Sequence, residues 1–206
     1  MISAVMDVNK PVGAMGELGH LSSTLFDDFI NVSKDAASFR DQKKDEESQQ
    51  AKRNSARALF AYIEGTVYAM KQAAYEIEQA PRVKMFTNAE ATLLREEDYG
   101  LGDKGKVSIR WARLRTEPNL CFAFDAFARV FECDYALRLE GEDAAAFRRA
   151  IKIRDRLTHP KRTSELLVSE TEFGDLFHVA QWFQDAFNGL INAVEKKLEA
   201  RKRSAD

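Results

Sequence analysis

The sequence predicts an all-α protein, an up-and-down helical bundle of four main helices with one or two shorter helices. The chain holds only 10 Gly and 4 Pro among 206 residues, so turns are few. Apolar residues recur at three- and four-residue steps over most of the chain. These two observations exclude a many-stranded sandwich or barrel. The shares of hydrophobic residues (45%) and charged residues (31%) exclude a disordered chain.

The first helices follow from this spacing. Residues 1–15 contain Pro11 and Gly13 and show no period, so we expect a loose N-terminal arm before a single helical-bundle domain over residues 16–206. A helix is expected over 16–38. The polar stretch 41–53 is expected as a loop that becomes helical near Glu46, and the clearest helical pattern of the chain continues from there to residue 79.

Shorter elements follow. Thr87 or Asn88 is expected to cap a short helix, with Glu90 completing a capping box. The segment 99–117 is an insertion between helices. Its glycine cluster and the alternation of Val107, Ile109 and Trp111 favour a short strand or hairpin.

Three further helices are expected toward the C-terminus. One begins near Pro118 and is apolar nearly all round, which is typical of a central helix. A second runs over 142–158 and ends at Pro160, because the residue before a proline is disfavoured in the α region. After a connector over 161–168, Ser169 caps the last helix with Glu172 three residues on.

Simple counts limit the function classes. The formal net charge of −2 argues against a protein that coats nucleic acid along its length. The sequence contains no signal peptide, no apolar run long enough for a membrane span, and no Cys/His ligand cluster. We therefore expect a cytoplasmic protein without a metal site, and we expect no cofactor, because nucleotide-binding and zinc motifs are absent.

One segment stands apart in charge. Between residues 148 and 162 the local balance is +6, because a single acid, Asp155, lies among seven basic residues. Such a cluster attracts phosphates. The basic residues are Arg148, Arg149, Lys152, Arg154, Arg156, Lys161 and Arg162.

Arg154 and His159 in this segment could act together on a phosphate. Five residues apart on a continuous helix, they would point about 140° from each other. Because Pro160 ends the helix, the imidazole of His159 is free to turn back over the last turn. Histidine transfers protons near neutral pH, and the arginine guanidinium forms bidentate hydrogen bonds to phosphate. With a 2′-hydroxyl as the nucleophile, this pair is a minimal metal-free ribonuclease site. Asp155 could orient either residue.

The run Arg154-Asp155-Arg156-Leu157-Thr158-His159 resembles the R-x4-6-H motif of HEPN domains, whose second position is usually Asn, Asp or His. These domains are small helical bundles, and many are metal-independent endoribonucleases of toxin–antitoxin and phage-defence systems. The resemblance implies Arg154 and His159 as the catalytic pair and Asp155 as the third polar member. It also implies RNA as substrate, a homodimer with two motifs at its interface, and an antitoxin protein as partner.

Two other interpretations remain open. The segment could bind nucleic acid or a protein without catalysis, with Arg149, Lys152, Arg156, Lys161 and Arg162 as contacts. Alternatively, its arginines could merely pair with acids such as Glu142 or Asp143. Only the first interpretation, an endoribonuclease, predicts RNA turnover.

Overall fold

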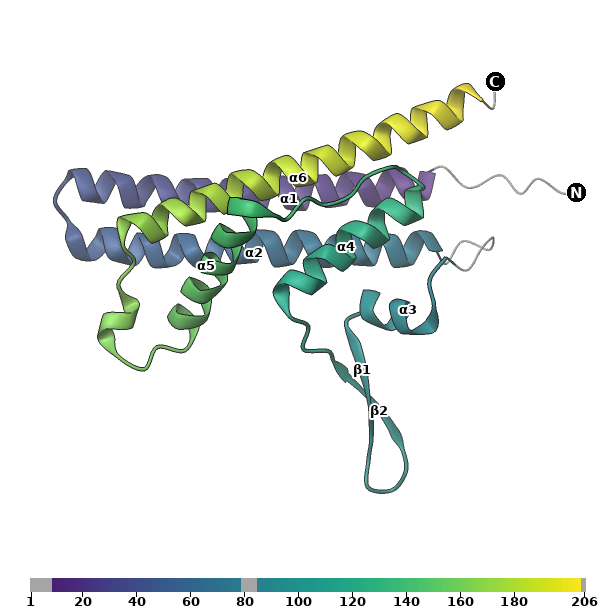
Figure 1. Ribbon diagram of the computed structural model, residues 1–206, viewed down its shortest axis with the longest axis horizontal. Helices are drawn as coiled ribbons and strands as arrows, with labels where there is room; N and C mark the ends of the chain where they lie inside the picture. The colour runs from purple at the N-terminus through teal and green to yellow at the C-terminus, as the bar shows by residue number, and fades with distance from the viewer. Residues whose placement is uncertain (1–8, 79–84, 205–206) are drawn as a thin grey trace, which may run out of the picture. The chain divides into compact units, whose positions relative to one another are not determined.

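The computed structural model describes residues 9–78 and 85–204 (Figure 1). It confirms the all-α prediction, because the only strands of these residues are two that form one antiparallel hairpin. In chain order the elements are α1 (Asn9–Asp41), α2 (Asp45–Glu78), α3 (Asn88–Leu94), β1 (Glu97–Leu101), β2 (Val107–Trp111), α4 (Thr116–Phe131), α5 (Gly141–Thr158), the 3-10 helix η1 (Thr163–Leu166) and α6 (Glu170–Arg203).

One expectation about the first elements was wrong. α1 begins at Asn9, so residues 9–15 of the expected loose arm are helical, and residues 1–8 lie outside the described residues. Pro11 is compatible with this, because the first turn of a helix does not need its N–H. The expected change from loop to helix near Glu46 is confirmed to within one residue. α2 begins at Asp45 with three acidic residues in its first turn, where a helix favours negative charge.

The chain groups into two compact units, comprising residues 1–19, 67–137 and 190–206, and residues 20–66 and 138–189. Neither is a continuous stretch, because α1, α2 and α6 each contribute residues to both. We call them unit 1 and unit 2. The expected single domain over 16–206 stays a prediction.

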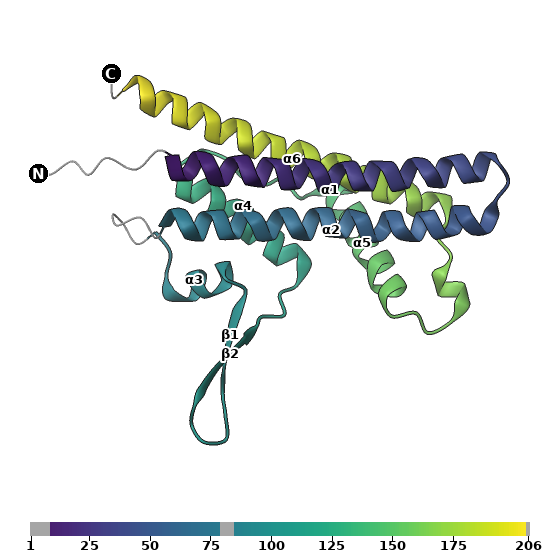
Figure 2. The ribbon, with the colours of Figure 1, turned by 180° about the vertical axis from the view of Figure 1, so that it is seen from behind.

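Unit 2 is built from parts of α1, α2 and α6 together with α5 and η1. α1 and α2 lie side by side and antiparallel (Figure 2). A Cβ on Gly65 would lie 2.8 Å from Leu25 Cδ1, so the glycine allows this close approach. The rings of Phe26 and Phe183 pack on Tyr62, whose hydroxyl bonds Gln184. Burial raises the pKa of Tyr62 to about 12.

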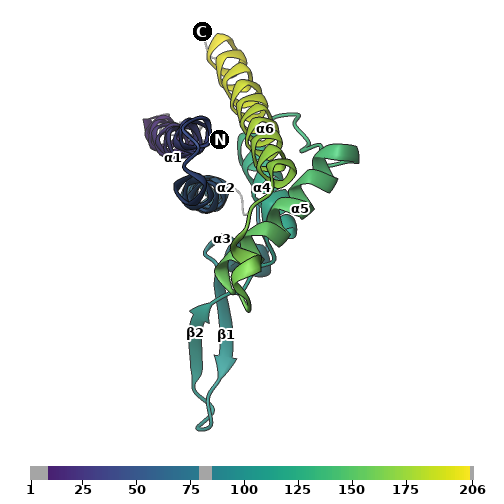
Figure 3. The ribbon, with the colours of Figure 1, turned by 90° about the vertical axis from the view of Figure 1, so that its left-hand side faces the viewer.

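Unit 1 contains α3, the hairpin and α4, together with the ends of α1, α2 and α6. The capping box of Thr87 and Glu90 at the start of α3 is present as predicted. The hairpin overlaps the predicted insertion over 99–117, beginning two residues earlier at Glu97, and projects away from α3 and α4 (Figures 1 and 3). Buried aromatic side chains of α4, Phe124, Phe127 and Phe131, form part of the core of this unit.

Candidate functional site

The candidate site lies at the C-terminal end of α5 in unit 2. Phe147, Ile153 and Leu157 form the buried face of this helix, which leaves the charged residues on its other faces. The helix ends at Thr158, as Pro160 predicts. His159 leaves the helical conformation, with φ −129° and ψ 57°, while its backbone N–H still donates to the Asp155 carbonyl at 3.1 Å.

Arg154 is held by residues of α2 that lie about 90 positions earlier in the chain. Its guanidinium lies 4.7 Å from the ring centroid of Phe60 and donates to the Glu64 carboxylate. Its Nε also donates to Asp155 at 3.0 Å. Because Phe60 and Glu64 are one turn apart on α2, they provide a flat surface and an anion for the same guanidinium. Arg154 is therefore fixed in orientation, with a quarter of its side chain exposed.

The expected trio of Arg154, Asp155 and His159 is placed only in part. Asp155 contacts Arg154, whereas the His159 imidazole is exposed and has no hydrogen-bond partner among the described residues. The structure thus joins the arginine to the acid of the motif and leaves the imidazole open to solvent. An exposed imidazole can exchange protons with a bound molecule, and a fixed guanidinium at the same end of the helix can contact a phosphate.

Two of the expected RNA contacts have intramolecular partners instead. Arg149 Nη2 binds Glu142 at 2.5 Å and Asp175 at 2.7 Å. The pairing with Glu142 is the one that the structural interpretation of the segment predicts. Arg156 donates to the Leu167 carbonyl at 2.9 Å and lies 3.1 Å from Glu172. Both arginines connect α5 to the chain around the start of α6.

The other three expected contacts remain exposed. The side chains of Lys152, Lys161 and Arg162 make no hydrogen bond or ion pair with any described residue. Lys161 uses only its backbone N–H, which donates to Glu165 at 2.7 Å. Exposed cations of this kind are the ones that a phosphate chain can neutralise without breaking an existing pair. Lys161 and Arg162 place two positive charges two and three residues after His159 in the chain.

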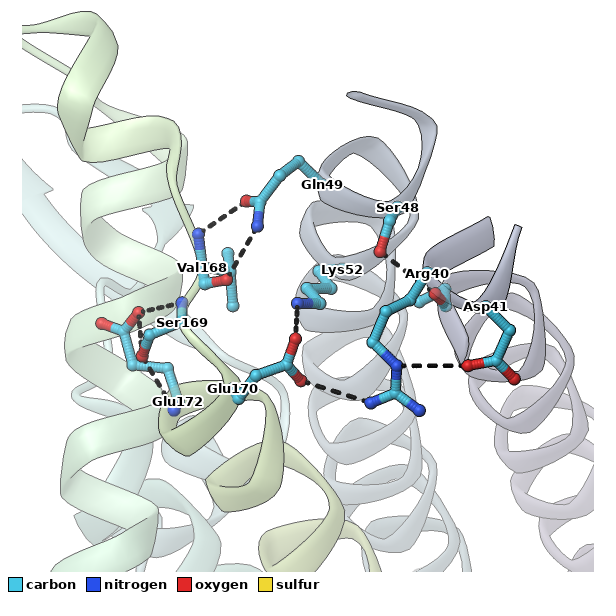
Figure 4. Close-up of polar contacts among 10 residues, drawn as sticks. Arg40, Asp41, Ser48, Gln49, Lys52, Val168, Ser169, Glu170 and Glu172 are labelled. Carbon is cyan, nitrogen blue, oxygen red and sulfur yellow. Dashed lines mark hydrogen bonds and ion pairs between the residues drawn. The ribbon is translucent and has the colours of Figure 1, made fainter. Parts of the chain in front are cut away.

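The segment that follows His159 is fixed to α2 by residues that the sequence did not single out (Figure 4). Gln49 donates to the Val168 carbonyl at 3.1 Å and accepts from the Val168 N–H at 2.9 Å. Lys52, which is almost fully buried, donates to Glu170 at 2.6 Å. Residues 160–169 are therefore held at their C-terminal end.

The predicted capping box at the start of α6 is present. The Ser169 N–H donates to Glu172, and the Glu172 N–H donates to the Ser169 hydroxyl (Figure 4). Partial burial alone would raise the pKa of Glu172, but the bonds from Ser169 and Arg156 outweigh it and lower the pKa below its usual value. Glu172 thus connects α5 to the first turn of α6.

Phe60, Glu64 and Gln49 are the site residues that sequence reasoning missed. Phe60 and Glu64 belong to the helical pattern of α2, and their spacing of four places them on one face. No local signal says that this face meets Arg154, because that contact depends on how distant helices pack.

None of the helices described is long and apolar enough to cross a membrane. Residues 9–78 and 85–204 also contain no group of three or more His, Cys, Asp or Glu side chains placed to hold a metal ion. No protein-family model, curated protein or solved structure matches this chain.

Proposed function

We propose that this chain is a HEPN-like, metal-independent endoribonuclease of the cytoplasm, in which Arg154 and His159 act on the RNA backbone. The observation that carries the proposal is the end of α5. The helix stops at Thr158, the His159 imidazole that follows is exposed, and the Arg154 guanidinium near the end of the same helix is held in place by Phe60 and Glu64. A fixed arginine and an unpartnered histidine suit charge stabilisation and proton transfer, respectively.

The reaction would be an internal transesterification. The 2′-oxygen of a ribose attacks the adjacent phosphorus, and the bond from phosphorus to the 5′-oxygen breaks. The His159 imidazole accepts the proton of the 2′-hydroxyl, and the leaving 5′-oxygen takes a proton from an imidazolium or from water. Arg154 stabilises the negative charge that develops on the phosphate oxygens. The products are a 2′,3′-cyclic phosphate end and a 5′-hydroxyl end.

The remaining cations have a separate role in this proposal. Lys152, Lys161 and Arg162 are exposed, and their side chains are unpaired among the described residues, so they attract the RNA strand without taking part in bond breaking. Arg149 and Arg156 act within the fold through their carboxylate partners. A second copy of the chain and an antitoxin protein are the proposed protein partners.

The test is RNA cleavage by the purified full chain in EDTA, with the new ends identified by mass spectrometry. We expect His159→Ala and Arg154→Lys each to lower the cleavage rate by about 100-fold or more. Arg154→Lys keeps the positive charge but removes the planar guanidinium, which can donate to two phosphate oxygens at once. The matched control is His20→Ala, which removes another exposed histidine, on α1, and should leave the rate unchanged.

Three outcomes would refute catalysis by this pair: intact RNA, cleavage that requires a divalent cation, or equal activity in His159→Ala. Salt-sensitive RNA binding without turnover would instead favour the binding module. If the chain is such a binding module, replacing both Lys161 and Arg162 should weaken its affinity for RNA, and His159→Ala should leave that affinity unchanged.

A further inference from the structure

The hairpin of unit 1 has an apolar face that the rest of the described chain leaves uncovered. Its register pairs Tyr99 with Ile109 and Leu101 with Val107, and Trp111 shares their face because alternate residues of a strand point the same way. Leu101 (76%), Trp111 (73%), Val107 (70%) and Ile109 (63%) are the most exposed large apolar residues described, and Tyr99 is 47% exposed. Apolar exposure on this scale marks an interaction surface.

The base of this hairpin is firmly held. Glu96, just before β1, has a left-handed backbone with φ 55° and accepts from Lys71 at 2.5 Å. Lys71 on α2 is fully buried and also donates to Asn119 of α4 at 2.8 Å. Arg95 lies 5.0 Å from the Tyr75 ring centroid. The hairpin is therefore attached to two helices, and its apolar face has a defined position in unit 1.

The two faces of the hairpin differ in polarity. The opposite face carries Ser108 and the ion pair between Arg110 and Asp98 at 2.7 Å, which suits contact with water. On the apolar face the only charged residue is Glu97, at the base opposite Trp111. Its carboxylate already accepts from Arg95 Nε at 2.8 Å. The one charge on this face is therefore already paired, and the rest of the face offers no charge for a charged partner to match.

We propose that this face binds the same face of a second copy of the chain, related by a twofold axis. Fully burying a large apolar side chain removes on the order of 100–200 Å² from water. At the exposures above, the five side chains present roughly 500 Å². This is most of the roughly 800 Å² that each partner contributes to a stable interface.

The chemistry of the face selects this occupant. A charged partner surface would lose its hydration against five apolar side chains without gaining an ion pair. A second copy presents an equally apolar face. Across a twofold axis the same patch of each chain contacts that of the other, so apolar side chains meet apolar side chains. The charged base and polar tip of each hairpin then form the rim, as in interfaces between identical subunits.

The test is self-association of the full chain, measured by sedimentation velocity from about 1 to 100 µM. We expect a dimer that Ile109→Asp weakens by at least about tenfold in Kd, because the carboxylate would be buried in the interface. The matched control, Ser108→Asp, adds the same charge one residue away on the opposite face and should leave Kd unchanged. Both positions are exposed, and far-UV circular dichroism should show equal helix content for all three proteins.

Tryptophan emission gives an independent readout. Trp111 is exposed in one chain, so its emission should shift to the blue as the concentration rises, and Ile109→Asp should abolish the shift. A wild-type chain that stays monomeric at 100 µM would overturn the proposal and indicate a different protein as occupant. A dimer that Ile109→Asp leaves intact would also overturn it, because another surface would then hold the copies together.

Discussion

Replacing Gln49 by alanine should destabilise unit 2 more than its partial exposure suggests. The side-chain amide of Gln49 bonds both the N–H and the carbonyl of Val168, and Val168 is fully buried. Gln49→Ala leaves both backbone groups without a partner. Each unsatisfied buried group costs about 1–3 kcal/mol, and water entering the vacated space recovers part of it. We expect the free energy of unfolding to fall by about 2–4 kcal/mol.

The assay is urea unfolding followed by circular dichroism, with Gln50→Ala as the control. Gln50 is the next residue on α2 and is exposed, so its loss should change the free energy of unfolding by less than about 0.5 kcal/mol. Gln49→Glu is a sharper variant. It keeps the shape and the acceptor for the Val168 N–H, but at neutral pH it places a carboxylate oxygen against the Val168 carbonyl.

Hydrogen exchange locates the effect. The Val168 amide proton should exchange faster in Gln49→Ala than in Gln50→Ala, because its acceptor is gone. If Gln49→Ala and Gln50→Ala unfold at the same urea concentration and protect this amide equally, the two bonds do not hold the segment after His159. The argument that residues 160–169 are fixed to α2 would then fail.

Three further predictions concern single side chains. Bonds from Arg129 and Thr87 lower the pKa of Glu90 to about 2. Glu90→Gln should therefore lower the free energy of unfolding by its full amount above pH 4.5, and this difference from the wild type should vanish as the pH falls through about 2. A difference that does not change with pH would contradict this. Gly65→Ile should lower the free energy of unfolding by about 1–3 kcal/mol, because even a Cβ meets Leu25; unchanged urea unfolding would show that α1 and α2 can separate at no cost. Glu64→Gln should lower kcat for RNA cleavage about 10- to 100-fold without raising KM, because the Arg154 guanidinium loses its charged partner; Glu76→Gln, an exposed acid elsewhere on α2, should not.

Features with a local cause could be read from the sequence. Pro160 predicts the end of α5 because a proline restricts the residue before it, and the two capping boxes require only a Ser or Thr and a Glu three residues apart. The hairpin follows from the alternation of Val107, Ile109 and Trp111. Each of these features depends on neighbours within a few positions.

Features that depend on packing could not be read this way. Glu64 and Phe60 meet Arg154 across about 90 residues of chain, and no spacing rule relates them. The helical conformation of residues 9–15 was not predicted for a different reason. Pro11 on its own favours a loop, but it lies in the first turn of α1, where a helix does not need its N–H.

Partner carboxylates change what the +6 charge of residues 148–162 means for RNA binding. Arg149, Arg154 and Arg156 are paired with acids of α2, α5 and α6, so few of their charges are available for counterion release. Three exposed cations together with Arg154 predict a slope of roughly −2 to −3 in log K against log salt for single-stranded RNA, whereas seven available cations would give roughly −5. Binding of a short RNA to His159→Ala from 50 to 300 mM salt measures this slope without cleavage. A slope near −5 would mean that RNA displaces the carboxylates, and Arg149→Ala should then reduce it by nearly one unit.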